Sequence, residues 1–262
     1  MNSQEDVKAN LGRAVHFIDE AARAGAELVA LPENFAFFGE EVDKRAIAEP
    51  VGGPEHGPII RAIAEAAKKG NVHVVAGGMP ERSPDGDRPY NASVLIAPSG
   101  AVVATYRKVH LFDVELAEGG SYKESAGTTP GSEAVVADVG GTKLGMAVCY
   151  DVRFAELFRA LGDKGARVVT VPAAFTLTTG KDHWNVLLRA RAIENQVFVV
   201  APAQHGKHPR GRMTYGKSMI IDPWGDVLAQ CGEGEGFAIA RLDFAYQDKV
   251  RASLPCLSHR RL

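Results

Sequence analysis

The sequence predicts an α/β protein in which two mixed β-sheets pack face to face and helices cover their outer sides. Two observations support this prediction. Segments with apolar residues at helical spacing lead into short apolar strands, and three pairs of strands meet at turns rich in glycine and proline. A strand that is apolar throughout must be buried on both of its faces, whereas a hairpin with alternating apolar and polar residues must be buried on one face only. A layered sandwich satisfies both requirements.

The first third of the chain alternates helix and strand. Apolar residues at helical spacing predict a helix from about Val7 to the region of Gly25, with Ser3 and Asp6 as a capping pair. A short strand at 27–31 then ends at proline. The same order follows in a helix that ends at Gly70 and a strand at 72–76.

The rest of the chain adds three hairpins and two further helix–strand units. The hairpins pair 93–97 with 102–106, 135–138 with 144–148, and 218–221 with 227–230. Helices are predicted at 154–161 and 185–195, and strands at 168–171, 197–201 and 237–240. The stretch 112–133 is predicted to be one long irregular loop, a kind of segment that often carries function.

Length and composition predict one domain over residues 1–262. The chain has 30 basic and 32 acidic residues, and this near-zero balance argues against a nucleic-acid or membrane partner. Its 3 cysteines cannot all pair, which favours a reduced, cytoplasmic protein. His205 and His208, with Cys231 downstream, match no zinc-site spacing, so we expect no metal.

Three residues that could take part in catalysis lie at the ends of predicted strands. Cys149 follows an apolar strand and precedes a polar turn, Glu33 follows the strand at 27–31, and Lys108 follows the strand at 102–106. A thiol needs a neighbouring base to become a nucleophile, and a lysine can stabilise an oxyanion. Each residue also has an ordinary interpretation: a core cysteine, a solvated loop glutamate and a surface lysine.

The local sequence around each of these residues resembles the motifs of the nitrilase superfamily of carbon–nitrogen hydrolases. The resemblance is carried by residues 31–35, 106–112 and 148–154, each of which contains one of the three. It extends over nearly the whole chain through residues 130–131, 183–184, 189–192 and 222–225.

This resemblance implies a four-layer α-β-β-α sandwich and a catalytic triad of Glu33, Lys108 and Cys149. It also implies a second glutamate, matched by Glu124, and an oxyanion donor in the main-chain N–H of Tyr150. The expected reaction is hydrolysis of a non-peptide carbon–nitrogen bond through a thioester, with water as co-substrate and no cofactor or metal. A homo-oligomer is expected, because the family often uses C-terminal segments at subunit contacts.

Within the superfamily, the sequence is most similar to the branch that contains deaminated glutathione amidase and omega-amidase. That branch implies an amidase for amides of small carboxylic acids, such as deaminated glutathione-like compounds or 2-oxo acid monoamides. Candidate substrate-binding residues are Arg153, Lys181, His183 and Arg191. Alternatives are a nitrilase, an N-carbamoyl amino acid hydrolase, acyl transfer to an amine, and a catalytically inactive scaffold of the same fold.

The chain departs from the family at its start. Family members usually open with a short apolar strand that runs into Gln-Met, and this chain begins at about that methionine. We therefore expect either a start assigned too late or a sheet that lacks its first strand.

Overall fold

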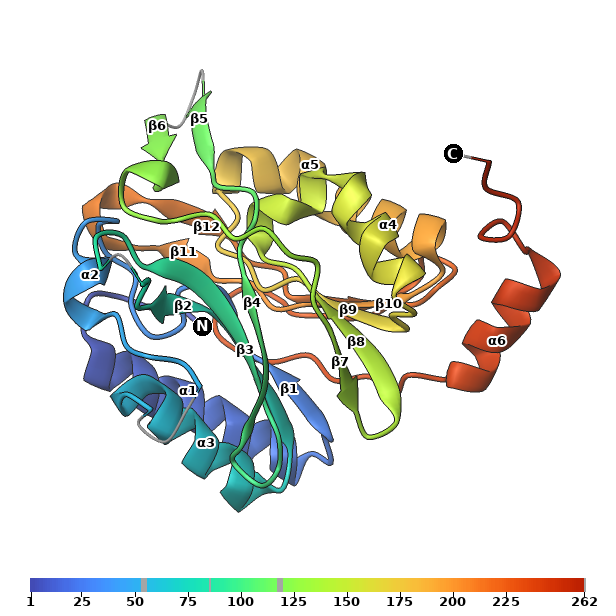
Figure 1. Cartoon of the computed structure of the whole chain (residues 1–262), viewed down its shortest axis with the longest axis horizontal. Coiled ribbons are helices and arrows are strands. Elements are labelled where there is room, and N and C mark those ends of the chain that lie inside the picture. Colours follow the sequence, from blue (N-terminus) through green and yellow to red (C-terminus); the bar gives the residue numbers. More distant parts are fainter. Residues whose placement is uncertain (53–55, 85, 117–119, 262) are drawn as a thin grey trace.

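The computed structural model describes residues 1–52, 56–84, 86–116 and 120–261. Two β-sheets form the centre, and helices lie on their outer sides (Figure 1). The predicted α-β-β-α sandwich is confirmed.

The first sheet has four strands in the order β1-β2-β3-β4. Strands β1 and β2 are parallel, and the two following pairs are antiparallel. Their bounds are Leu28–Ala30 for β1, His73–Glu81 for β2, Tyr90–Ile96 for β3 and Val102–Arg107 for β4. The sheet is therefore mixed, as expected.

The second sheet has six strands in the order β14-β13-β10-β9-β8-β7. Its centre, β10-β9-β8, is parallel, and its outer pairs are antiparallel hairpins. All three predicted hairpins are confirmed by these pairings and by the β3–β4 pair. The bounds are Val136–Val139 (β7), Thr142–Met146 (β8), Val168–Thr170 (β9), Phe198–Ala201 (β10), Met219–Ile221 (β13) and Val227–Gln230 (β14).

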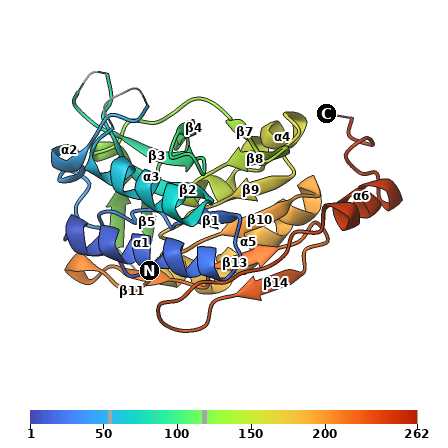
Figure 2. The same ribbon diagram turned by 90° about the horizontal axis from the view of Figure 1, so that it is seen from below.

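Helices cover the outer face of each sheet, and each of them buries one side against it. Helices α1 (Val7–Arg23) and α3 (Pro58–Gly70) lie side by side over the four-stranded sheet (Figure 2). Helices α4 (Ala155–Asp163) and α5 (Leu177–Asn195) cover the six-stranded sheet. Between the sheets, Val75 and Leu95 share one buried cluster with Leu144 and Met146.

Short elements complete the chain. Strands β5 (Asp113–Leu116) and β6 (Gly120–Lys123) form one hairpin, and β11 (His205–Lys207) and β12 (Met213–Tyr215) form another. The remaining helices are α2 (Lys44–Ile47), α6 (Phe244–Ser253) and the 3-10 turns η1 (Glu124–Ala126), η2 (Cys149–Arg153) and η3 (Pro209–Gly211).

Three local predictions were wrong. Asp6 alone caps α1, because its carboxylate accepts from Ala9 N, while the Ser3 hydroxyl donates to Phe35 O. The stretch 112–133 is not all irregular, since β5, β6 and η1 lie within it; residues 117–119 are outside the described part. Residues 237–240 form no strand, although their alternation is typical of one, because no described strand pairs with them.

Strand β1 is the terminal strand of the four-stranded sheet. The absence of a first strand stays a prediction. Within the described ranges, every helix is too short or too polar to cross a bilayer.

His208 joins the start of the chain to the β11–β12 region. Its Nδ1 lies 2.9 Å from Ser3 O and its Nε2 lies 2.7 Å from Thr214 Oγ1. The imidazole also stacks on Phe38, with ring centroids 3.9 Å apart. Burial lowers the pKa of His208 to about 4, so the folded protein holds this imidazole neutral at neutral pH.

We predict that His208→Gln makes stability less sensitive to acid. Between pH 6.5 and 4 the unfolded chain protonates this imidazole and the folded chain does not. The stabilisation is thus complete above the unfolded pKa and falls as the pH falls, by about 2 kcal/mol from pH 7 to pH 5. Glutamine takes up no proton, so urea unfolding should give the variant a smaller loss over this interval. His16→Gln, at an exposed position on α1, should keep the wild-type loss; equal losses in all three proteins would contradict the prediction.

Candidate active site

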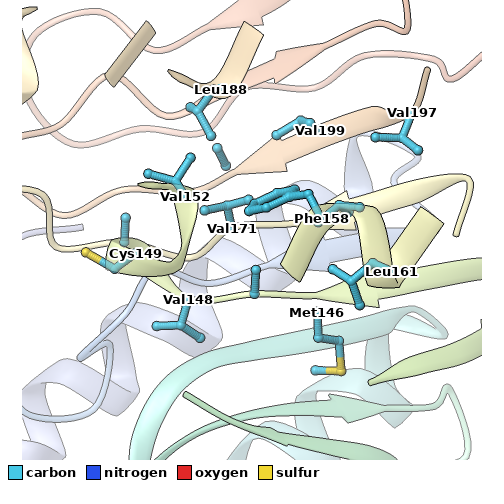
Figure 3. Packing of buried hydrophobic residues seen from close by; sticks show 14 of the residues in the cluster. Met146, Val148, Cys149, Val152, Phe158, Leu161, Val171, Leu188, Val197 and Val199 are labelled. Atoms are coloured by element: carbon cyan, nitrogen blue, oxygen red, sulfur yellow. The ribbon is translucent and has the colours of Figure 1, made fainter. Parts of the chain in front are cut away.

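Cys149 stands at a strained turn where strand β8 leads into helix α4. Its φ is +48°, in the left-handed region that non-glycine residues rarely adopt, and such strain concentrates at functional sites. Its N–H donates to Pro172 O at 2.8 Å. Figure 3 shows Cys149 at the edge of the buried cluster, with its sulfur pointing away from Phe158 and Leu161. The backbone therefore turns the thiol out of the core.

Asp151 fixes this turn and ties it to the end of β4. Its fully buried carboxylate accepts from Val148 N at 2.8 Å and from the Tyr106 hydroxyl at 2.7 Å. It also accepts from His110 N at 3.1 Å and lies 2.8 Å from His110 Nδ1. Tyr106 and His110 flank Lys108 in the chain, so these bonds bring Lys108 to the cysteine turn.

Glu33 is buried just after strand β1 and has both carboxylate oxygens bonded. Oε1 accepts from Lys108 Nζ at 3.0 Å and from Asn91 Nδ2 at 2.9 Å, and Oε2 accepts from Ala174 N at 2.9 Å. Gly78 makes room for it, because a Cβ there would lie 2.7 Å from Glu33 Cγ. These contacts aim the carboxylate at one position.

Glu124 reaches the same lysine from turn η1. Its Oε2 accepts from Lys108 Nζ at 2.8 Å and from Phe112 N at 2.7 Å. Its Oε1 accepts from Lys108 Nζ at 3.1 Å and from Asn91 Nδ2 at 3.1 Å. The ammonium of Lys108, whose side chain is 2% exposed, thus lies between two buried carboxylates.

The pKa shifts follow from this arrangement. Burial would lower the pKa of Lys108, but Glu124 and Glu33 outweigh it and raise that pKa well above its usual value. Burial would raise the pKa of Glu124, and Lys108 reverses this so that the pKa is lowered. Burial raises the pKa of the Cys149 thiol well above its usual value, and the nearby Glu33 adds to the effect while Lys108 opposes it. At neutral pH the thiol is therefore protonated and needs a base to react.

A pocket opens above these groups. It encloses about 700 Å³ of space, a volume that includes the open solvent at its mouth. Glu33, Lys108, Glu124 and Cys149 all line it, together with Tyr150 beside the cysteine. The other walls combine aromatic and polar side chains: Phe38, Phe112, Tyr122, Phe175, Glu41, Lys44, Lys123, Thr176, Thr179, Arg212 and Thr214.

The structure thus brings together four predicted side chains and Tyr150, but the four candidate substrate-binding residues do not line this pocket. Arg191 is buried, with Nε donating to Val152 O at 2.8 Å and Nη1 donating to Glu194 at 2.7 Å. Arg153 lies next to the pocket, over the Phe175 ring and 3.3 Å from His183 Nδ1. Lys181 is exposed on helix α5. Contact of these residues with substrate stays a prediction.

Sequence analysis missed Asn91 and Arg212. Asn91 bonds both carboxylates through one amide nitrogen, and the available signal was a polar residue within the apolar strand β3. Arg212 lines the pocket from a loop that lies far from the three motifs in the chain. No local pattern marked it.

No cluster of three or more histidine, cysteine, aspartate or glutamate side chains in the described ranges could hold a metal ion. The three carboxylates that line the pocket, those of Glu33, Glu41 and Glu124, are each paired with Lys108 or Lys44.

Comparison with known proteins finds three informative similarities. A family model described as carbon–nitrogen hydrolase matches residues 1–252. A protein from Synechocystis named deaminated glutathione amidase is 46% identical over 99% of this chain and 95% of its own length. Among solved structures, the Caenorhabditis elegans NitFhit protein matches with a TM-score of 0.91 and 39% identity over 100% of this chain. The chain spans 63% of that protein.

A further solved structure is an amidase from Nesterenkonia sp. AN1. It matches with a TM-score of 0.78 and 27% identity over 97% of this chain and 95% of its own. The structure is of a glutamate-to-glutamine variant with acrylamide added at the active-site cysteine.

We predict that Lys108→Met destabilises the fold by about 3–5 kcal/mol, because it leaves two buried carboxylates without their shared cation. Glu124→Gln in the same background removes one of the two charges and should restore part of the stability. Urea unfolding of the single and double variants at pH 7 measures both effects. A double variant no more stable than Lys108→Met would contradict the electrostatic explanation.

Proposed function

The chain belongs to the carbon–nitrogen hydrolase family, and from this membership and the geometry of its pocket we propose that it is a cysteine-dependent amidase for amides of small carboxylic acids. The observation that carries the proposal is Cys149, turned out of the core into the pocket that Glu33, Lys108 and Glu124 line. Substrates of the deaminated glutathione type fit the name of the Synechocystis relative, and 2-oxo acid monoamides are the second class that we propose.

Glu33 starts the reaction as a general base. It takes the thiol proton as the Cys149 sulfur attacks the amide carbonyl carbon. Lys108 and the main-chain N–H of Tyr150 stabilise the oxygen that gains negative charge. The proton moves from sulfur to Glu33, and the negative charge passes from the carboxylate to the carbonyl oxygen, so the number of charges in the buried site stays constant as the oxyanion forms. A base is needed for this step because burial raises the pKa of the Cys149 thiol and so disfavours its ionisation.

Collapse of the tetrahedral intermediate breaks the carbon–nitrogen bond. Glu33 returns its proton to the leaving nitrogen, and a thioester of Cys149 remains. Glu33 then takes a proton from water as the water oxygen attacks the thioester carbon. The carbon–sulfur bond breaks, the carboxylic acid leaves, and the proton returns to sulfur. Glu124 positions Lys108 throughout, since it accepts two bonds from the ammonium.

The proposal also places the protein in the cytoplasm as a homo-oligomer. Three cysteines without disulfides suit a reducing compartment. Val186 and Ile193 on α5, with Trp224 on the β13–β14 turn, are exposed apolar side chains of the kind that a second copy would cover. Light scattering after size-exclusion chromatography tests the assembly, and cell fractionation tests the location.

We predict that Cys149→Ala lowers amide hydrolysis by at least about 10⁴-fold, because no thioester can form. Ammonia release from glutaramate, the monoamide of glutaric acid, measures the loss. Rapid quenching of the wild type and intact-mass analysis should show one acyl group, which peptide mapping places on Cys149.

Cys231→Ser and Cys256→Ser are the matched controls, since both residues are free and neither lines the pocket. They should keep full activity. Undiminished hydrolysis by Cys149→Ala, or an acyl group on another residue, would overturn the proposal. A panel that includes nitriles and N-carbamoyl amino acids tests the substrate class, and turnover of nitriles alone would overturn the amidase assignment.

A further inference from the structure

The charges of the pocket are unevenly distributed. Lys108 forms ion pairs with the carboxylates of Glu33 and Glu124. Lys44 forms an ion pair with the third carboxylate, that of Glu41, and its ammonium lies 2.9 Å from the nearer oxygen. Two further cations line the pocket without such a close pair in the described residues. The complete charged set is Glu33, Glu41, Glu124, Lys44, Lys108, Lys123 and Arg212. The cations of this set that are left without a close carboxylate partner in the described part of the chain are therefore Arg212 and Lys123.

Arg212 has unused hydrogen-bonding capacity. It joins turn η3 to strand β12, and its side chain is 26% exposed. Among the described residues its nearest carboxylate oxygens belong to Glu40, at 3.9 Å, and Glu41, at 4.0 Å. Its one hydrogen bond there is a long one of 3.4 Å to Gly39 O. A guanidinium has five N–H donors, so most of those of Arg212 lack a close acceptor among the described residues.

Arg210, in the same loop, has a closer carboxylate partner than Arg212. Its Nε lies 3.1 Å from Glu40, its side chain is 66% exposed, and it does not line the pocket. Glu40 is thus taken by Arg210, which leaves Arg212 without a close partner of its own. The two arginines share a loop and a neighbouring carboxylate but differ in access to the pocket.

We infer that Arg212 is the specificity-determining residue that binds a carboxylate at the end of the substrate remote from the scissile amide. The inference rests on the proposed function and adds the substrate's charge. A guanidinium binds a carboxylate through two parallel hydrogen bonds, and partial burial strengthens them. The preferred substrate is therefore an amide with an anionic tail, held with its amide at Cys149 and its tail at Arg212.

Binding of glutarate tests this without any need for catalysis. Calorimetry should show that wild type binds this dicarboxylate and that Arg212→Gln weakens the affinity by at least about tenfold, as expected for loss of a charge-assisted pair. Arg210→Gln should bind like wild type, and Arg212→Lys should recover part of the loss. No binding to wild type, or equal affinities in wild type and Arg212→Gln, overturns the inference.

Kinetics with a matched substrate pair supply the second test. Glutaramate carries a carboxylate where glutaramide, the diamide, carries a neutral amide of the same shape. Arg212→Gln should raise KM for glutaramate at least about tenfold with little change in kcat, and should leave glutaramide unchanged. An equal loss on both substrates overturns the inference. A wild type that hydrolyses neither amide would overturn the proposed function instead, while the glutarate result still decides the role of Arg212.

Discussion

The buried ammonium of Lys108 between Glu33 and Glu124 is the interaction on which the rest of the site depends. Two carboxylates could not both stay ionised in this buried place without it, and the lysine could not stay charged without them. In the proposed mechanism Glu33 is the base beside a protonated thiol. The first proton transfer of that mechanism creates no additional buried charge.

Each of the two sheets contributes different residues to this cluster. The four-stranded sheet supplies Glu33 after β1 and Lys108 after β4, while the six-stranded sheet supplies Cys149 after β8. Asp151 joins the two halves, since its carboxylate accepts from the cysteine turn and from residues on both sides of Lys108. The packing of sheet on sheet thus fixes the site, and a hairpin outside both sheets completes it with Glu124.

Local apolar patterns place Glu33, Lys108 and Cys149 at the ends of strands. Their grouping into one site with Glu124 and Tyr150 could be predicted only through the family resemblance. Asn91 and Arg212 could not be found in this way, because their roles come from contacts across the chain, such as that of Asn91 with Glu124. The hairpin β5–β6 was missed for a related reason: its two four-residue strands pair with each other and belong to neither of the two main sheets.

Charge separation within the pocket explains why recognition and chemistry need different cations. The cluster of Glu33, Lys108 and Glu124 has one more negative than positive charge, so it repels an anionic group that approaches the cysteine. In the resting site the Lys108 ammonium is already paired with both carboxylates, and in the proposed mechanism it stabilises the oxyanion only after Glu33 has taken up the thiol proton. An anionic substrate must therefore place its neutral amide at the cluster and its charge far from it. Arg212, in the same pocket but away from the carboxylates that Lys108 holds, meets both conditions.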